Sequence, residues 1–203
     1  MTDTPLITTN RLEAFSDGVI AIIITIMVFD LKFQNVPTPA NLGMEVRLLL
    51  PKFLSYALSF LVLAIMWVNH HQLLQQIKQT DRKLLWLNIH LLFWMSLIPF
   101  VTSFIGASPW LPQASAAYGA VFSFAALGFL LLRNYANRAQ LMHEKISQQG
   151  KRRAQYKNYL GVSLYISAAA AAFISVYISF VCFLIVPAMY FMPEQILHDK
   201  HLE

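Results

Sequence analysis

Long apolar segments separated by polar stretches dominate this sequence of 203 residues. A helix needs about 20 consecutive apolar residues to cross the hydrocarbon core of a bilayer. The last apolar block, 158–192, is too long for one such helix and fits two short ones joined by a turn near 173–175. The pattern therefore predicts six membrane-spanning helices, over residues 12–31, 53–74, 84–105, 114–132, 157–173 and 175–192.

Composition agrees with this pattern. Hydrophobic residues make up 57% of the chain and charged residues only 12%, whereas soluble domains carry roughly a quarter of charged residues. The net charge of +5 does not indicate nucleic acid as a partner, because basic residues accumulate in the cytoplasmic loops of membrane proteins. We expect residues 1–203 to form a single transmembrane domain of the all-α class, in contact with lipid.

The distribution of basic residues predicts the orientation. A short polar segment, 78–83, and a long basic linker, 133–156, both fall on one side of a six-helix topology, together with both termini. They hold most of the lysines and arginines outside the Pro-rich 32–52 loop. Because such residues favour the cytoplasmic side, we predict a multi-pass protein of the plasma membrane with both termini in the cytoplasm.

The first predicted helix has two different faces. At about 100° per residue, one stripe is apolar apart from a single hydroxyl. Asp17 points about a third of a turn away from it, and Ser16 points in another direction again. The stripe consists of Gly18, Ile22, Thr25 and Phe29, with Phe15 and Ile26 on its edge and Arg11 on its continuation.

Polar residues within a membrane helix cost several kcal/mol unless they pair or contact water, so they are candidate functional residues. Ser16 and Asp17 need partners, which the cytoplasmic ends of the second and third predicted helices supply. We expect a hydrogen-bonded network that satisfies these buried groups, with Arg11 joining it or lining the inner entrance. Its predicted members are Arg11, Ser16, Asp17, Trp67, His70, His71 and Asn88.

Neither metal binding nor catalysis is expected. His70 and His71 diverge by about 100° on a helix, and no HExxH or CxxC motif accompanies them. A nucleophile can be built only from Ser16 with His70 or His71, and packing explains the same residues. The sequence has no GxSxG, P-loop or GxGxxG motif and no TVGYG-like filter loop. We therefore predict a protein that is not an enzyme and has no cofactor, and any ion path must be lined by helix side chains.

Several motifs resemble one known family. Residues 11–18, RLEAFSDG, resemble the RxxxFSDG signature of the transmembrane protein 175 family of endosomal and lysosomal potassium channels. Residues 67–71, WVNHH, and Asn88 followed by Ile98-Pro99-Phe100 are similar to its second- and third-span patterns. The resemblance covers all six predicted spans, and RxxxFSDG is its most specific part.

The resemblance implies a homotetramer whose first helices line a central pore for potassium ions. An apolar ring on that helix forms the constriction in the family, without a carbonyl filter. On this sequence the pore-lining residues would be Ile22, Thr25, Ile26 and Phe29. Phe29 stands where the family usually has leucine, which leaves open whether Ile22 or Phe29 is the narrowest point.

Two alternatives stay open. Asp30, near the outer mouth, either attracts cations toward the pore or pairs with Lys32. A small proton-coupled secondary transporter is the main rival function, with Asp17 and the His70/His71 region as a proton relay. The sequence lacks the inverted repeats and matched broken helices that such transporters often have.

Overall fold

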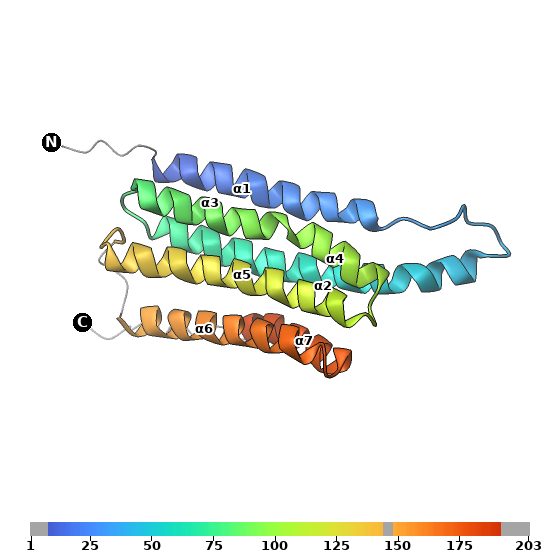
Figure 1. Ribbon diagram of the computed structural model, residues 1–203. Helices are drawn as coiled ribbons and strands as arrows, with labels where there is room; N and C mark the ends of the chain where they lie inside the picture. The colour runs from blue at the N-terminus through green and yellow to red at the C-terminus, as the bar shows by residue number, and fades with distance from the viewer. Residues whose placement is uncertain (1–7, 144–147, 192–203) are drawn as a thin grey trace, which may run out of the picture.

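The computed structural model describes residues 8–143 and 148–191 and shows a bundle of long helices (Figure 1). The prediction of an all-α fold is confirmed, since no strand forms among these residues and only an isolated bridge joins Ile77 to Met142. The helices are α1 (Thr9–Ile26), which continues as the short helix η1 (Met27–Asp30), α2 (Leu42–Gln75), α3 (Arg82–Ser96), α4 (Ile98–Ala107), α5 (Pro112–Arg138), α6 (Gln148–Ala171) and α7 (Val176–Phe191).

The second helix begins much earlier than the predicted span. It begins at Leu42 rather than near Phe53 and contains Pro51, and its first turns project beyond the other helices (Figure 1). Glu45 anchors this extension, because its carboxylate accepts hydrogen bonds from the backbone N–H groups of Gln34 and Asn35, at 2.9 and 3.2 Å. The Asn35 side-chain amide also donates to it, at 2.7 Å, so the preceding loop is tied to α2.

The third predicted span is divided into two helices. α3 ends at Ser96 and α4 begins at Ile98, with a proline, Pro99, in its first turn. Proline lacks a backbone N–H and its ring clashes with the preceding turn, so it commonly kinks or ends a helix. The break at Leu97 therefore follows from the local sequence, which the apolar pattern alone does not reveal.

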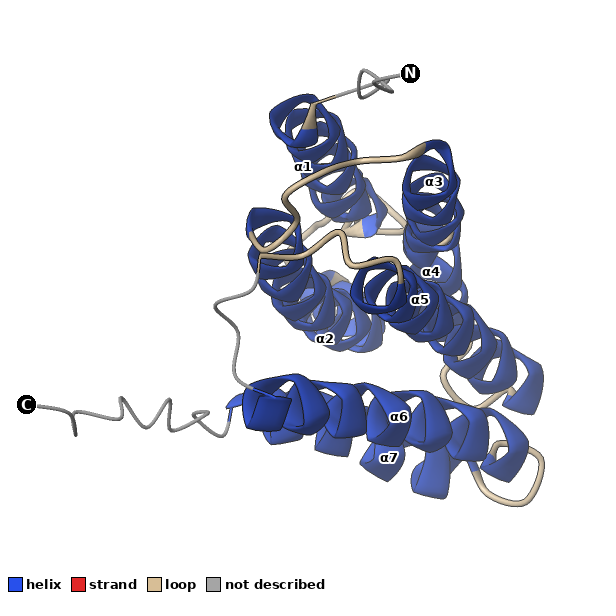
Figure 2. Ribbon diagram, turned by 90° about the vertical axis from the view of Figure 1, so that its left-hand side faces the viewer, coloured by secondary structure: helices blue, strands red, loops and turns tan. Residues whose placement is uncertain are grey.

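The last apolar block forms the hairpin of α6 and α7, with a turn between Ala171 and Val176. Figure 2 shows this hairpin running obliquely across the other helices, on the side of the bundle away from α1. By length and composition, four helical segments of the described chain can cross a membrane: 9–30, 42–75, 82–107 and 112–138. α7 is a shorter apolar helix, and the end of the predicted last span at 192 lies outside the described residues.

Close packing holds α5 at the centre of the bundle. A side chain at Gly119 would approach the Cβ of Ala169 on α6 to 2.9 Å and its backbone N to 3.0 Å, so the two helices touch through small residues, as is common in membranes. On the other side of α5, the Tyr118 hydroxyl lies 3.0 Å from Ser59 Oγ, which accepts a hydrogen bond of 2.7 Å from Thr102. These hydroxyls connect α2, α4 and α5.

Successive long segments run in opposite directions, so the connections gather at two ends. The α2–α3 and α5–α6 connections lie at the end where α1 begins and α7 finishes (Figure 1). The α2–α3 connection also pairs with the segment after α5, since Lys78 N–H donates to Leu141 C=O at 2.7 Å and His143 N–H donates to Gln76 C=O at 2.9 Å. The basic linker is shorter than the predicted 133–156, because α5 continues to Arg138; residues 144–147 lie outside the described part.

Candidate pore helix and its polar anchor

α1 lies at the edge of the bundle, with one face packed and the other uncovered (Figures 1 and 2). Ile20 is 1% exposed and packs into the core, as do Leu12, Ile23 and Met27. On the opposite face, Ile22 is 61% exposed and Phe29 is 76% exposed. The uncovered residues include the whole predicted stripe, namely Phe15, Gly18, Ile22, Thr25, Ile26 and Phe29, and extend beyond it to Ala14, Ala21 and Val28.

The packed face carries a buried chain of polar side chains. Asn88 on α3 donates from its amide nitrogen to Ser16 Oγ at 2.9 Å, and its amide oxygen lies 2.8 Å from His70 Nε2 on α2. Ser16 in turn donates to the Leu12 carbonyl at 2.8 Å. All three residues are buried. Their hydrogen bonds therefore join α1, α2 and α3 without exposing a polar atom to lipid.

A second set of contacts lies closer to the surface. The indole N–H of Trp67 donates to the Asp17 carboxylate at 2.9 Å. His71 Nδ1 lies 2.7 Å from the Glu13 carboxylate, and its Nε2 lies 2.8 Å from the Gln75 amide nitrogen. The approach of His71 Nδ1 to Glu13 is close, but its geometry is not that of a hydrogen bond. The contacts of Asp17 with Trp67 and of Glu13 with His71 hold α1 against α2, beside the buried hydrogen bonds of Ser16.

The grouping of Glu13, Asp17 and His71 was not predicted, since Glu13 was not among the expected members of the network. Their ligand atoms lie within 4.8 Å of one another, a spacing at which a metal ion could be held. Each group already has a protein partner, so the contacts account for the cluster without a metal. The signal that could have revealed it is the spacing of Glu13 and Asp17, which share one helix face at i and i+4.

Arg11 and Asp30 stand apart from these contacts. In the described part of the chain, neither makes a hydrogen bond or an ion pair through its side chain, so Arg11 does not join the network and Asp30 does not pair with Lys32. Arg11 is exposed and lines a groove between α1 and α3 together with Leu12, Phe15, Leu85 and Ile89. Asp30 lies at the opposite end of the helix, half-buried.

Comparison with known proteins identifies the family. Residues 11–99 match the model of the family described as endosomal/lysosomal potassium channel TMEM175. A protein of Chryseobacterium sp. (strain P1-3), named a potassium channel, is 37% identical over 188 residues, covering 93% of this chain and 95% of that protein. The chain belongs to the TMEM175 family.

A solved structure supports the same assignment. The crystal structure of a homologue of the lysosomal potassium-selective channel TMEM175, from Chamaesiphon minutus, matches with a TM-score of 0.75 and 29% identity, over 90% of this chain and 95% of that one. Human TMEM175, named an endosomal/lysosomal proton channel, is 33% identical over 117 residues, which is 54% of this chain and 21% of the human protein. Since TMEM175 relatives are named channels, this membrane protein is a channel-family member and not an enzyme.

Proposed function

We propose that four copies of this chain assemble around α1 into a potassium channel of the TMEM175 type. The observation that carries the proposal is the uncovered stripe of α1, which runs along the whole helix while Ser16 and Asp17 are hydrogen-bonded on other sides of the helix. The tetramer and its fourfold axis come from the family resemblance, and the stripe supplies the surface that would face this axis.

The stripe has the chemistry of a hydrophobic constriction. A ring of four Ile22 side chains offers no partner for the hydration shell of an ion, and such constrictions gate by dewetting. Thr25 lies one turn further along, and its hydroxyl donates to the Ile22 carbonyl at 3.0 Å. Its oxygen lone pairs therefore remain available to a partly dehydrated cation. Because potassium gives up water more readily than sodium, this pair of rings favours potassium.

The outer end of the pore wall would consist of Ile26 and Phe29, followed by Asp30. Four copies of Asp30, which forms no ion pair with the residues that the structure describes, would concentrate cations at the outer mouth. Phe29 is bulkier than leucine and is the more exposed of the two candidate constriction residues. We assign the gate to Ile22 because it lies deeper along the helix, and Phe29 to a second, outer narrowing.

The proposal includes an orientation. Basic segments 78–83 and the linker after α5 lie at the end of the bundle where α1 begins (Figure 1). This end would face the cytoplasm of a cell whose plasma membrane holds the protein, according to the positive-inside rule. Glu13, Asp17 and His71 would then lie near the cytoplasmic surface, and the projecting start of α2 would lie outside.

Replacing the gate residue tests the pore. Ile22→Asn introduces four amides into the constriction, so it should wet the ring and raise the potassium leak of reconstituted liposomes about tenfold, with a smaller preference for potassium over sodium. Val28→Asn is the matched control, since Val28 is also an exposed apolar residue of the same segment but lies about 120° away around the axis. Equal potassium leak in the two variants would show that the Ile22 face of α1 does not line the pore.

Proton-coupled transport remains the rival function, and the names of the vertebrate relatives give a reason to test it. In the described structure His70, His71 and Asp17 contact Asn88, Glu13 and Trp67, so they do not form one continuous relay. Single-channel recording in potassium and proton gradients separates the functions. Unitary potassium currents that persist without a proton gradient support the channel, whereas flux that requires protons and saturates steeply supports the transporter.

A further inference from the structure

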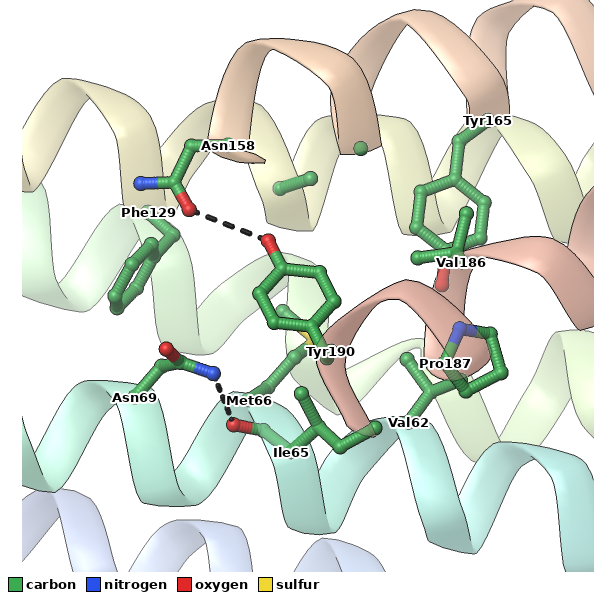
Figure 3. A pocket seen from close by; sticks show the side chains of 12 residues that line it. Val62, Ile65, Met66, Asn69, Phe129, Asn158, Tyr165, Val186, Pro187 and Tyr190 are labelled. Atoms are coloured by element: carbon green, nitrogen blue, oxygen red, sulfur yellow. Dashed lines mark hydrogen bonds between the residues drawn. The ribbon is translucent and has the colours of Figure 1, made fainter. Parts of the chain in front are cut away.

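A lateral cleft separates the α6–α7 hairpin from α2 and α5, on the side of the chain away from the α1 stripe (Figure 3). It encloses about 510 Å³ of empty space, counting its open side, and its lining is mostly apolar. The cleft is therefore an open-sided slot, which an apolar chain could enter from the surrounding lipid.

The two ends of the cleft differ in polarity. Asn69, Asn158 and the Tyr190 hydroxyl lie at one end, and Val62, Val186 and Pro187 lie at the other, together with Tyr165 (Figure 3). Asn69 and Val62 are seven residues apart on α2, which is about 10 Å at the rise of an α-helix. The end with the two amides is nearer the α2–α3 and α5–α6 connections, and apart from the Tyr165 hydroxyl the cleft becomes apolar toward the middle of the bundle.

Two buried polar groups in the cleft lack partners. Asn158 is 6% exposed, and its amide oxygen accepts from Tyr190 at 3.3 Å, but its amide nitrogen has no hydrogen-bond partner among the described residues. The hydroxyl of Tyr165, which is 4% exposed, also lacks one. Because a buried donor without a partner destabilises the fold, the Asn158 amide at the polar end indicates a ligand that supplies an acceptor there.

Positive charge flanks the polar end. Arg133 lies over the ring of Phe129, a cleft residue, at 5.1 Å from the guanidinium carbon to the ring centroid. Lys157 precedes Asn158 on α6. Basic pockets between membrane helices on the cytoplasmic side bind anionic lipid headgroups, and this end is the cytoplasmic one in the orientation proposed above.

We propose that the cleft binds an anionic phospholipid of the inner leaflet. One acyl chain occupies the slot toward Val62 and Val186, an ester carbonyl accepts from the Asn158 amide, and the phosphate lies near Arg133 and Lys157. Gly161 keeps the slot open, because a Cβ there would already lie 3.6 Å from the Tyr190 hydroxyl. The site rests on the proposed membrane orientation but not on ion conduction.

The test uses the full-length protein in nanodiscs with phosphatidylglycerol that carries a photoreactive diazirine at the end of one acyl chain. We expect saturable crosslinks on α2 and α7 near Val62 and Val186, reduced about tenfold by Gly161→Leu, which fills the slot, and by Asn158→Leu, which removes the donor. The matched control is Ser163→Ala, since Ser163 is exposed on α6 and bonds only its own helix, at Tyr159 C=O. It should crosslink like wild type.

Two further comparisons decide the chemistry. Unlabelled phosphatidylglycerol should compete with the probe on the wild-type protein, and a phosphatidylcholine probe should crosslink several-fold less. Crosslinks spread evenly over the exposed face of α6, or equal crosslinking by both headgroups, would overturn the proposal. Since no step requires ion flux, crosslinks at the cleft in a protein that carries no potassium current would contradict the pore proposal while supporting the lipid site.

Discussion

Asn88 on α3 joins three helices through hydrogen bonds, because it contacts residues of α1 and α2. Its amide contacts Ser16 on one side and His70 on the other, and both partners are buried. Asn88→Leu should lower the free energy of unfolding by about 1–3 kcal/mol, because a hydroxyl and an imidazole lose their partner in the interior. Denaturant unfolding of the purified protein in detergent measures this change.

The neighbouring amide on α2 provides the control. Asn69 is only half-buried and donates to the Ile65 carbonyl of its own helix, at 2.8 Å, so Asn69→Leu should change stability by much less. Ser16→Ala combined with Asn88→Leu should cost less than the sum of the single changes, because the two residues share one contact. Additive losses would show that the Ser16–Asn88 bond contributes little to the fold.

Residue-level chemistry was partly predictable from the sequence. Ser16, Asp17, Trp67, His70, His71 and Asn88 were singled out because polar groups in apolar helices need partners, and the structure brings them together in two separate sets. Which residue belongs to which set depends on the side-chain directions on three helices, and a helical wheel of one helix does not give these. The contact of Glu13 with His71 was not predicted, because it joins two helices whose relative position the sequence does not give.

At the scale of the helices, the contact of α5 with α6 depends on a missing side chain. A Cβ at Gly119 would lie 2.9 Å from Ala169 Cβ and 3.1 Å from its Cα, and backbone atoms cannot move aside cheaply. Gly119→Ala should therefore destabilise the protein by about 1–3 kcal/mol, the usual cost of overpacking. The midpoint of thermal unfolding in detergent reports the loss.

Gly43→Ala is the matched control for this substitution. Gly43 lies in the first turn of α2, and a Cβ there would meet nothing within 4 Å. Alanine is the better helix former by up to about 1 kcal/mol, so this change should leave stability unchanged or raise it slightly. If Gly119→Ala were equally harmless, the close approach of α5 and α6 would not be a stabilising contact.

The apolar pattern located the helices better than it located their ends. Hydrophobic periodicity records the part of a helix in contact with lipid or core, and α2 and α5 both continue into polar sequence beyond it. The extension of α2 back to Leu42 depends on Glu45 holding the preceding loop, a contact between segments that composition does not reveal. The break at Leu97 was likewise hidden, although Pro99 is the local cause.

At the scale of the whole molecule, the arrangement of the connections predicts a sidedness that can be measured in cells. Val36 is 82% exposed in the loop before α2, and Ala139 is exposed at the end of α5. In a Cys182→Ser background, Val36→Cys should react with a membrane-impermeant maleimide in intact cells, and Ala139→Cys should react only after lysis. The reverse result would place the basic segments outside and contradict the proposed orientation.

In the proposed channel, the uncovered stripe of α1 would line the ion path. Single-channel recording of Ile22→Cys and Val28→Cys, each in the Cys182→Ser background, tests it most directly, with silver ions as a small thiol-reactive cation. We expect rapid and irreversible block of potassium current in Ile22→Cys and unchanged current in Val28→Cys. Block of Val28→Cys with no effect on Ile22→Cys would contradict it.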